Sequence, residues 1–167
     1  RGVDSIDLCV KEGEWFGFIG PNGAGKSTTI RTLLGLIKPT KGESRVFGLD
    51  SWKESERIME GIGYLPSEAI FYPEMSVKET LDYALSFFKN KDKRRQEELC
   101  ERFQLDTKRK VGELSYGNRK KVGIVSALQH SPSLLILDEP TGGLDPLMQR
   151  EFFNVLEEEH KKGKTIF

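Results

Sequence analysis

The sequence has few cysteines, no net charge and no long apolar run. Its 167 residues include only two cysteines, Cys9 and Cys100. They have no metal-binding spacing and build no disulfide framework, as expected of a reducing compartment or of two small core residues. The 26 basic and 26 acidic residues balance, so no overall field attracts nucleic acid or anionic lipid, and no nucleic-acid partner is expected. No run approaches the roughly 18 apolar residues that span a bilayer, so a role at a membrane would come through a partner.

The length of the chain suits one domain with a hydrophobic core and is too short for a second full domain. The chain begins at Arg1 rather than at methionine, and it stops at Phe167 inside an apolar, β-like run. We therefore expect a fragment of a longer protein, truncated at both ends.

Apolar, β-favouring runs alternate with segments of helical periodicity. The runs are IDLCV, EWFGFIG, ESRVF, GIGYL, SLLILD and KTIF, at residues 6–10, 14–20, 43–47, 61–65, 133–138 and 164–167. This alternation predicts an α/β fold, with a mostly parallel sheet flanked by helices and a small N-terminal β region. Helix starts are expected at Ser51 and Ser76, each followed three residues later by glutamate, and at Asp145 before a proline. From residue 74 to residue 113 the strand-like runs disappear, which predicts a helical insertion.

The stretch GPNGAGKST, residues 20–28, fits the phosphate-loop pattern of a glycine, four residues and then Gly-Lys-Ser. A β-like run precedes it and a helical run follows, so backbone N–H groups and the start of a helix would converge on an anion. Lys26 is expected to hold the β- and γ-phosphates, and Ser27 to give an oxygen to Mg²⁺. The spacing of a dinucleotide-binding loop is absent. The candidate nucleotide-binding residues are Gly20, Pro21, Asn22, Gly23, Ala24, Gly25, Lys26, Ser27 and Thr28.

Two carboxylates end the apolar run LLILDEP, residues 134–140. A buried aspartate at the carboxyl end of a parallel strand needs compensation, which a metal ion would supply. Asp138 is therefore a candidate Mg²⁺ ligand, direct or through water, and Glu139 is placed to polarise a water that attacks the γ-phosphate. The alternative is that both carboxylates only cap the next turn.

The stretch ELSYGNRKK, residues 113–121, lies between these motifs and opens a helical run. With the phosphate loop and LLILDEP it makes the whole chain resemble the nucleotide-binding domain of an ATP-binding cassette (ABC) protein, whose signature is LSGGQ. The resemblance implies a P-loop NTPase core that binds ATP and Mg²⁺ and pairs head to tail with a second cassette. Ser115 and Gly117 would then contact the partner's ATP. Tyr116 stands where the family has glycine, so either its backbone is ordinary or this half-site is weakened, and an ordinary helix N-cap is the alternative for the stretch.

Other segments resemble further family motifs. TGGLD, residues 141–145, resembles the loop that crosses the dimer interface. Residues 63–77 resemble the segment with the Q-loop, but Ser67 stands where the family has glutamine, so either Glu68 substitutes or the metal contact is lost. The resemblance places the adenine-stacking aromatic residue before Arg1 and the switch histidine after Phe167. His130 and His160 are expected at the surface or at helix ends.

The resemblance implies an ATPase in which Glu139 and Lys26 are catalytic. Residues 1–167 would form one ABC ATPase domain, with a helical subdomain at about 74–130. The function expected is the ATP-binding and ATP-hydrolysing subunit of a transporter. It would lie at the cytoplasmic face of the membrane, held by a separate transmembrane permease, and would drive export of a drug, peptide or ion. The alternatives are a soluble ABC ATPase acting on ribosomes or DNA, a nucleotide-sensing module with negligible turnover, and a monomeric P-loop kinase.

Overall fold

The centre of the protein is a parallel sheet of three strands. The computed structural model describes residue 3 and residues 5–167. The strands β3 (Ile62–Leu65), β4 (Leu134–Leu137) and β5 (Thr165–Ile166) lie in the order β3-β4-β5. Ile62 pairs with Leu134, and Leu134 pairs with Thr165 on its other side. The strands expected in these three runs and their parallel arrangement are therefore confirmed.

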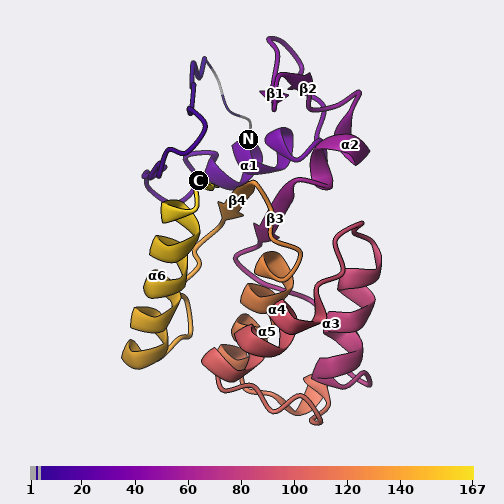
Figure 1. Ribbon diagram of the computed structural model, residues 1–167. Coiled ribbons are helices and arrows are strands. Elements are labelled where there is room, and N and C mark those ends of the chain that lie inside the picture. Colours follow the sequence, from indigo (N-terminus) through magenta and orange to yellow (C-terminus); the bar gives the residue numbers. More distant parts are fainter. Residues whose placement is uncertain (1–2, 4) are drawn as a thin grey trace.

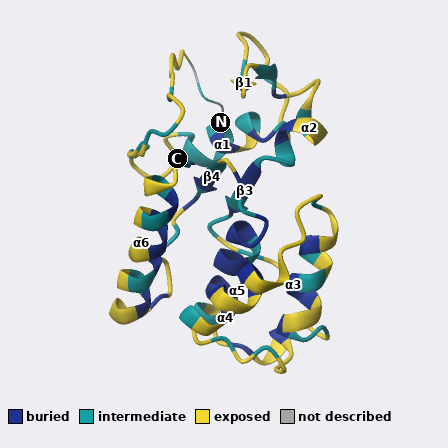
Figure 2. Cartoon of the chain, in the orientation of Figure 1, coloured by how far each residue is buried: buried dark blue, intermediate teal, exposed yellow. Residues whose placement is uncertain are grey.

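The sheet carries hydrophobic clusters on both faces, because β4 alternates its side chains between them. Leu135 belongs to the cluster formed mainly with the helices that follow β3 and β4. Ile136 belongs to the other cluster, together with Ile30 and Leu34 of the helix after the phosphate loop. Figure 2 shows this buried band through the centre of the chain. A strand covered on both faces explains why LLIL is apolar at four consecutive positions.

The N-terminal half contains less regular structure than the sequence predicts. Residues 14–20 form no strand and make only an isolated parallel bridge between Trp15 and Ile166. Residues 17–20 are assigned to no strand. The strand expected at residues 6–10 is also wrong, since among the described residues no neighbouring strand pairs with it. A β region does form further on, where β1 (Arg45–Val46) and β2 (Leu49–Asp50) make a two-residue hairpin.

Three helices accompany the sheet. They are α1 (Lys26–Leu33), α2 (Ser55–Met59) and α6 (Pro146–Lys161). The start of α6 is confirmed, because the Asp145 side chain accepts the N–H groups of Leu147 and Met148. A helix start at Ser51 is wrong. The Asp50 carboxylate accepts the N–H groups of Trp52 and Lys53, and the Ser51 hydroxyl is hydrogen-bonded to that of Ser44. The helix α2 therefore begins only at Ser55.

The region between β3 and β4 is helical, as its composition predicts. It contains α3 (Val77–Ser86), α4 (Lys93–Arg102), a short 3-10 turn η1 (Val111–Glu113) and α5 (Tyr116–Leu128). The capping box of Ser76 and Glu79 at the start of α3 is present. Figure 1 shows α3, α4 and α5 together at one end of the molecule, with the β1–β2 hairpin and α2 at the other. Within the described part of the chain no helix has the length and hydropathy to cross a membrane.

Charged side chains join α4 to α6. Arg95 donates to Glu159 at 2.6 Å, and the side chains of both residues are almost fully buried. Arg102 bonds Glu158 through both terminal nitrogens, at 2.7 and 2.8 Å, and reaches Glu151 at 2.6 Å. Bidentate pairs of this kind hold their partners in a defined orientation.

Candidate nucleotide-binding site

The phosphate loop ends in a glycine that starts α1. Gly25 is the N-cap of α1 with φ 92°, a left-handed conformation that favours glycine, and no side chain caps the helix there. A Cβ at this position would lie 2.4 Å from Cγ2 of Val3. The N–H groups at the start of α1 thus remain open to an anion, as in other phosphate-binding helices.

The side chain of Lys26 folds back over the loop. Its Nζ donates to the carbonyl oxygens of Gly20 and Pro21, at 2.6 and 3.1 Å. Residues 21–24 are exposed, and Thr28 lies partly buried in the first turn of α1. The ammonium therefore rests on carbonyl oxygens at the mouth of the loop, within reach of a phosphate bound there.

Ser27 and Asp138 bring the two halves of the site together. The Ser27 hydroxyl donates to Oδ2 of Asp138 at 2.9 Å. Asp138 follows β4, is 6% exposed, and is held by its own N–H, which donates to the carbonyl oxygen of Leu65. A hydroxyl and a carboxylate oxygen at this separation fit Mg²⁺, which takes one or two protein oxygens and completes its shell with phosphate and water. Burial, and after it the negative charge of the same carboxylate, raises the pKa of Tyr64.

Glu139 lies next to this pair in a strained conformation. Its φ is 48°, which is unusual for a residue with a side chain, and it is exposed. Its carbonyl oxygen accepts the N–H of Gly142, which closes a tight turn. In the described part of the chain, neither the Asp138 nor the Glu139 carboxylate accepts a backbone N–H of this turn. The alternative that both carboxylates only cap the turn is therefore wrong.

The signature-like stretch forms the start of α5. Ser115 is the N-cap and accepts the N–H of Asn118 at 3.3 Å. Tyr116 is the first helical residue, and its φ is not positive, so its backbone is ordinary. Its ring lies against Gly143, where a Cβ would come within 2.3 Å of Cδ1. A Cβ at Gly117 would come within 2.4 Å of the Gly143 carbonyl oxygen. The start of α5 therefore packs on the loop that follows Glu139.

The sequence model of a family described as "ABC transporter" matches residues 3–142. The chain belongs to the ABC transporter family. Its parallel sheet flanked by helices is the fold of the P-loop ATP-binding cassettes in that family.

Three similar proteins illustrate the family relationship. The bacitracin transport ATP-binding protein BcrA of Bacillus licheniformis is 41% identical over 170 residues, which cover 100% of this chain and 56% of BcrA. A solved ATP-binding subunit of an ABC transporter is 30% identical with a TM-score of 0.89, over 98% of this chain and 71% of that one. The ATP-binding cassette MJ0796, solved as a dimer in a post-hydrolysis state with ADP and Pi, is 25% identical with a TM-score of 0.86, over 98% and 77% of the two chains. The chain thus spans little more than half the length of BcrA.

Within this ABC cassette fold the two histidines lie at helix ends. His130 follows the end of α5 and is buried, with its ring stacked on Phe88 at 3.6 Å. His160 lies in the last turn of α6, and its Nε2 is 2.9 Å from the carbonyl oxygen of Gly13. Both histidines were expected at the surface or at helix ends. His130 lies at a helix end but not at the surface.

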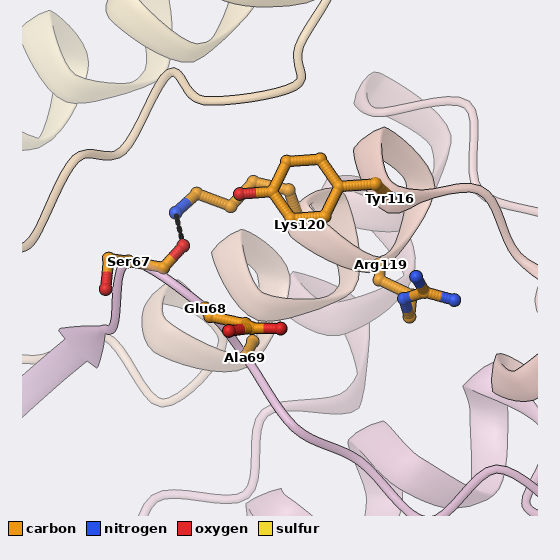
Figure 3. A pocket seen from close by; sticks show the side chains of 6 residues that line it. All are labelled: Ser67, Glu68, Ala69, Tyr116, Arg119 and Lys120. Atoms are coloured by element: carbon orange, nitrogen blue, oxygen red, sulfur yellow. Dashed lines mark hydrogen bonds between the residues drawn. The ribbon is translucent and has the colours of Figure 1, made fainter.

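The loop after β3 holds a contact that the sequence did not reveal. Nζ of Lys120 donates to the carbonyl oxygens of Pro66 and Ser67, at 3.0 and 2.9 Å. Figure 3 shows this ammonium pointing at Ser67, with the side chain of Glu68 directed away from it. Burial lowers the pKa of Lys120, and the charges of Asp138 and Glu139 oppose that shift. No clear signal in the sequence marks this contact, because Lys120 stands in the basic stretch at residues 119–121, ahead of the apolar part of α5.

Exposed aromatic residues form a second feature near this loop. The rings of Tyr72, Tyr83 and Phe87 meet edge to face in succession, with centroids 6.3 and 5.0 Å apart. Tyr72 is 65% exposed, Phe87 is 67% exposed and Ile70 is 90% exposed. We call these three rings, together with Ile70 two residues before Tyr72, the aromatic face. Exposed apolar side chains that cluster in this way commonly mark an interaction surface.

Proposed function

We propose that this chain is the ATP-binding and ATP-hydrolysing part of an ABC transporter. The observation that carries the proposal is the 2.9 Å contact between Ser27 and Asp138, which brings a phosphate loop and a buried carboxylate to one point. Family membership supports the same activity. The similar protein BcrA is a bacitracin transport protein, which favours transport over an ATPase of ribosomes or DNA.

In this proposal the phosphate loop binds the nucleotide and Lys26 positions it. The loop N–H groups and the start of α1 hold the phosphates, and Lys26 exchanges the carbonyl oxygens of Gly20 and Pro21 for the β- and γ-phosphates. Ser27 and Asp138 would hold Mg²⁺, which when bound neutralises developing charge on the phosphate oxygens. Glu139 orients and polarises the attacking water. The nucleotide-binding set is the loop Gly20, Pro21, Asn22, Gly23, Ala24, Gly25, Lys26, Ser27 and Thr28.

The site is completed by a second cassette. Ser115 is exposed at the N-terminus of α5, a helix of 13 residues. The Ser115 hydroxyl and the N–H groups of the first helical turn face outward there. We propose that Ser115 and Gly117 contact the ATP held by the partner, and that ATP closes the pair while hydrolysis reopens it. The dimer in which the related cassette MJ0796 was solved supports this arrangement.

A transmembrane permease is the second partner. We propose that residues 1–167 form one cassette, whose helical subdomain at about 74–130 receives the permease. The aromatic face, with Ile70 and Tyr72 from the loop after β3, Tyr83 from α3 and Phe87 at the C-cap of α3, offers it an apolar surface. The cassette would then lie at the cytoplasmic face of the membrane and drive export of a drug, peptide or ion.

Sedimentation of a Glu139→Gln form of the full-length protein tests this function. The substitution removes the carboxylate that activates water and leaves the phosphate loop intact, so ATP should stay bound. We expect a dimer with Mg-ATP and a monomer with ADP, whereas the unsubstituted protein hydrolyses ATP and returns to monomer. A Glu139→Gln form that hydrolyses ATP at the unsubstituted rate, or that stays monomeric with bound ATP, would contradict the proposal.

A further inference from the structure

Lys120 is a charged side chain placed in the interior of the protein. The residue is 2% exposed, yet its ammonium lies between α5 and the loop after β3. A buried charge is tolerated when it is hydrogen-bonded. Here the two partners are backbone carbonyl oxygens of consecutive residues, Pro66 and Ser67. Two acceptors from one loop hold that loop at a defined position on α5.

The loop held by Lys120 lies at the same edge of the sheet as the carboxylates of the site. Pro66 directly follows β3, as Asp138 directly follows β4, and the N–H of Asp138 donates to the carbonyl oxygen of Leu65 at 2.8 Å. The negative charges of Asp138 and Glu139 both act on the Lys120 ammonium. Lys120 is therefore linked to the loop after β3 by hydrogen bonds, and to Asp138 and Glu139 by electrostatic attraction.

The same stretch of helix connects with the loop after Glu139. Tyr116 and Gly117, one turn before Lys120, pack against Gly143. A displacement at the N-terminus of α5 therefore acts on two loops, through packing on one and through hydrogen bonds on the other. Both loops flank the Asp138 and Glu139 pair.

The ammonium keeps one donor beyond its two carbonyl partners. A small cavity of about 30 Å³ adjoins it, lined by Ser67, Glu68, Ala69, Tyr116, Arg119 and Lys120. That volume is of the size that holds one water molecule, and the lining is polar enough to bind it. The third donor of Lys120 can therefore be satisfied without a protein partner, which leaves the contact with the loop complete.

We propose that Lys120 is a positioning residue that couples the signature end of α5 to the loop after β3. Contact at Ser115 would move α5, and Lys120 would carry Pro66 and Ser67 with it, so that Asp138 and Glu139 are aligned for hydrolysis. The inference deepens the proposed function and rests on it. In this inference, residue 67 is joined to α5 through its backbone carbonyl oxygen, and the charged side chain that bonds to this oxygen comes from the helix.

The test compares Lys120→Met with Lys120→Arg in the full-length protein. Methionine keeps the apolar stem and loses the charge and all donors, whereas arginine keeps both. Lys121→Met is the matched control. Lys121 is the next residue of α5 and is also buried, and in the described part of the chain it makes no hydrogen bond with the loop. The measurements are kcat, the Kd for ATP, the Tm, and hydrogen exchange at the amides of residues 67–71.

We expect Lys120→Met to lower kcat about tenfold or more, with the Kd for ATP within about twofold of the unsubstituted value. Amide exchange at residues 67–71 should rise by a similar factor, because the loop loses its anchor. Lys120→Arg should stay within about threefold in both readouts, and Lys121→Met should match the unsubstituted protein.

Three results would overturn the inference. The first is unchanged exchange at residues 67–71 in Lys120→Met. The second is unchanged kcat in that variant, and the third is an equal loss of kcat in Lys121→Met with a lowered Tm in both. If the unsubstituted protein binds but does not hydrolyse ATP, the proposed function fails, and the exchange measurement still decides whether Lys120 anchors the loop. If Lys120→Met fails to fold, the same comparison is made with Lys120→Gln, which keeps a neutral donor.

Discussion

The side-chain oxygens of Ser27 and Asp138 lie 2.9 Å apart, although 111 residues separate them in the sequence. The contact joins the first turn of α1 to the end of β4. It also satisfies the Asp138 carboxylate, which is buried at that edge of the sheet. The phosphate loop and the carboxylates at the end of β4 are therefore parts of one site.

Replacing Asp138 by asparagine should abolish most of the ATP turnover. The amide can still accept the Ser27 hydroxyl, so the fold should persist, but the charge that would hold Mg²⁺ is lost. We expect a fall in kcat of about 100-fold or more, measured by phosphate release at saturating Mg-ATP. Asp106→Asn is the control, because Asp106 is exposed and its side chain, among the described residues, accepts only the N–H of Lys108 in its local turn. Turnover by Asp138→Asn within threefold of the unsubstituted protein would refute the metal assignment.

Replacing Glu139 by glycine should stabilise the protein while it removes activity. Glu139 has φ 48°, a conformation that costs a residue with a side chain about 1–2 kcal/mol, and glycine relieves it. After the larger entropy of unfolded glycine is subtracted, we expect Glu139→Gly to unfold with a free energy about 0.5–1 kcal/mol above that of Glu139→Gln. Urea denaturation of the two variants measures this difference. A glycine variant less stable than the glutamine variant would show that the strain is not costly.

The packing of Tyr116 on Gly143 predicts a non-additive pair of substitutions. Gly143→Ala places a Cβ 2.3 Å from the Tyr116 ring at a φ of 77°, so we expect a loss of about 2–4 kcal/mol in the free energy of unfolding. In a Tyr116→Ala background the ring is gone, and the cost should fall to the backbone part of about 1–2 kcal/mol. A double-mutant cycle by urea denaturation tests this coupling. Equal costs of Gly143→Ala in both backgrounds would rule it out.

His130 should make the stability depend on pH. Burial lowers the pKa of His130 below its ordinary value of 6.5, and the contact of Nε2 with the Ile62 carbonyl oxygen only partly offsets this. The unfolded chain therefore binds the proton more tightly, so the stability is complete above pH 6.5 and is lost as the pH falls through 6.5 toward the folded pKa. We expect the free energy of unfolding to fall between pH 7.5 and pH 5.5, and to fall less in His130→Gln. Identical pH profiles for the two proteins would disprove this role.

The sequence predicts those parts of the site that depend on local chemistry. The glycine spacing around Lys26 fixes a phosphate loop, and a continuous apolar run ending in Asp138 fixes a central strand and its carboxyl end. Both properties are contained in fewer than about ten neighbouring residues. The three strands of the parallel sheet were predicted for the same reason.

Contacts between distant segments were not predictable in this way. A strand at residues 6–10 needs a neighbouring strand, which the pattern of those residues cannot supply. The helix start at Ser51 failed because Asp50 competes for the same N–H groups. The bonds of Lys120 cross more than 50 residues of sequence, and a lysine on a helix ordinarily faces water.

The ion pairs between α4 and α6 hold these two helices together. Arg95 and Arg102 would each have to give up a short contact for α4 to slide over α6, so a push on one helix is transmitted to the other. The N-terminus of α6 is capped by Asp145, directly after the loop that holds Gly143. The start of α5, which packs on Gly143, and the N-terminus of α6, a helix that ion pairs join to α4, therefore both meet the loop at residues 139–145.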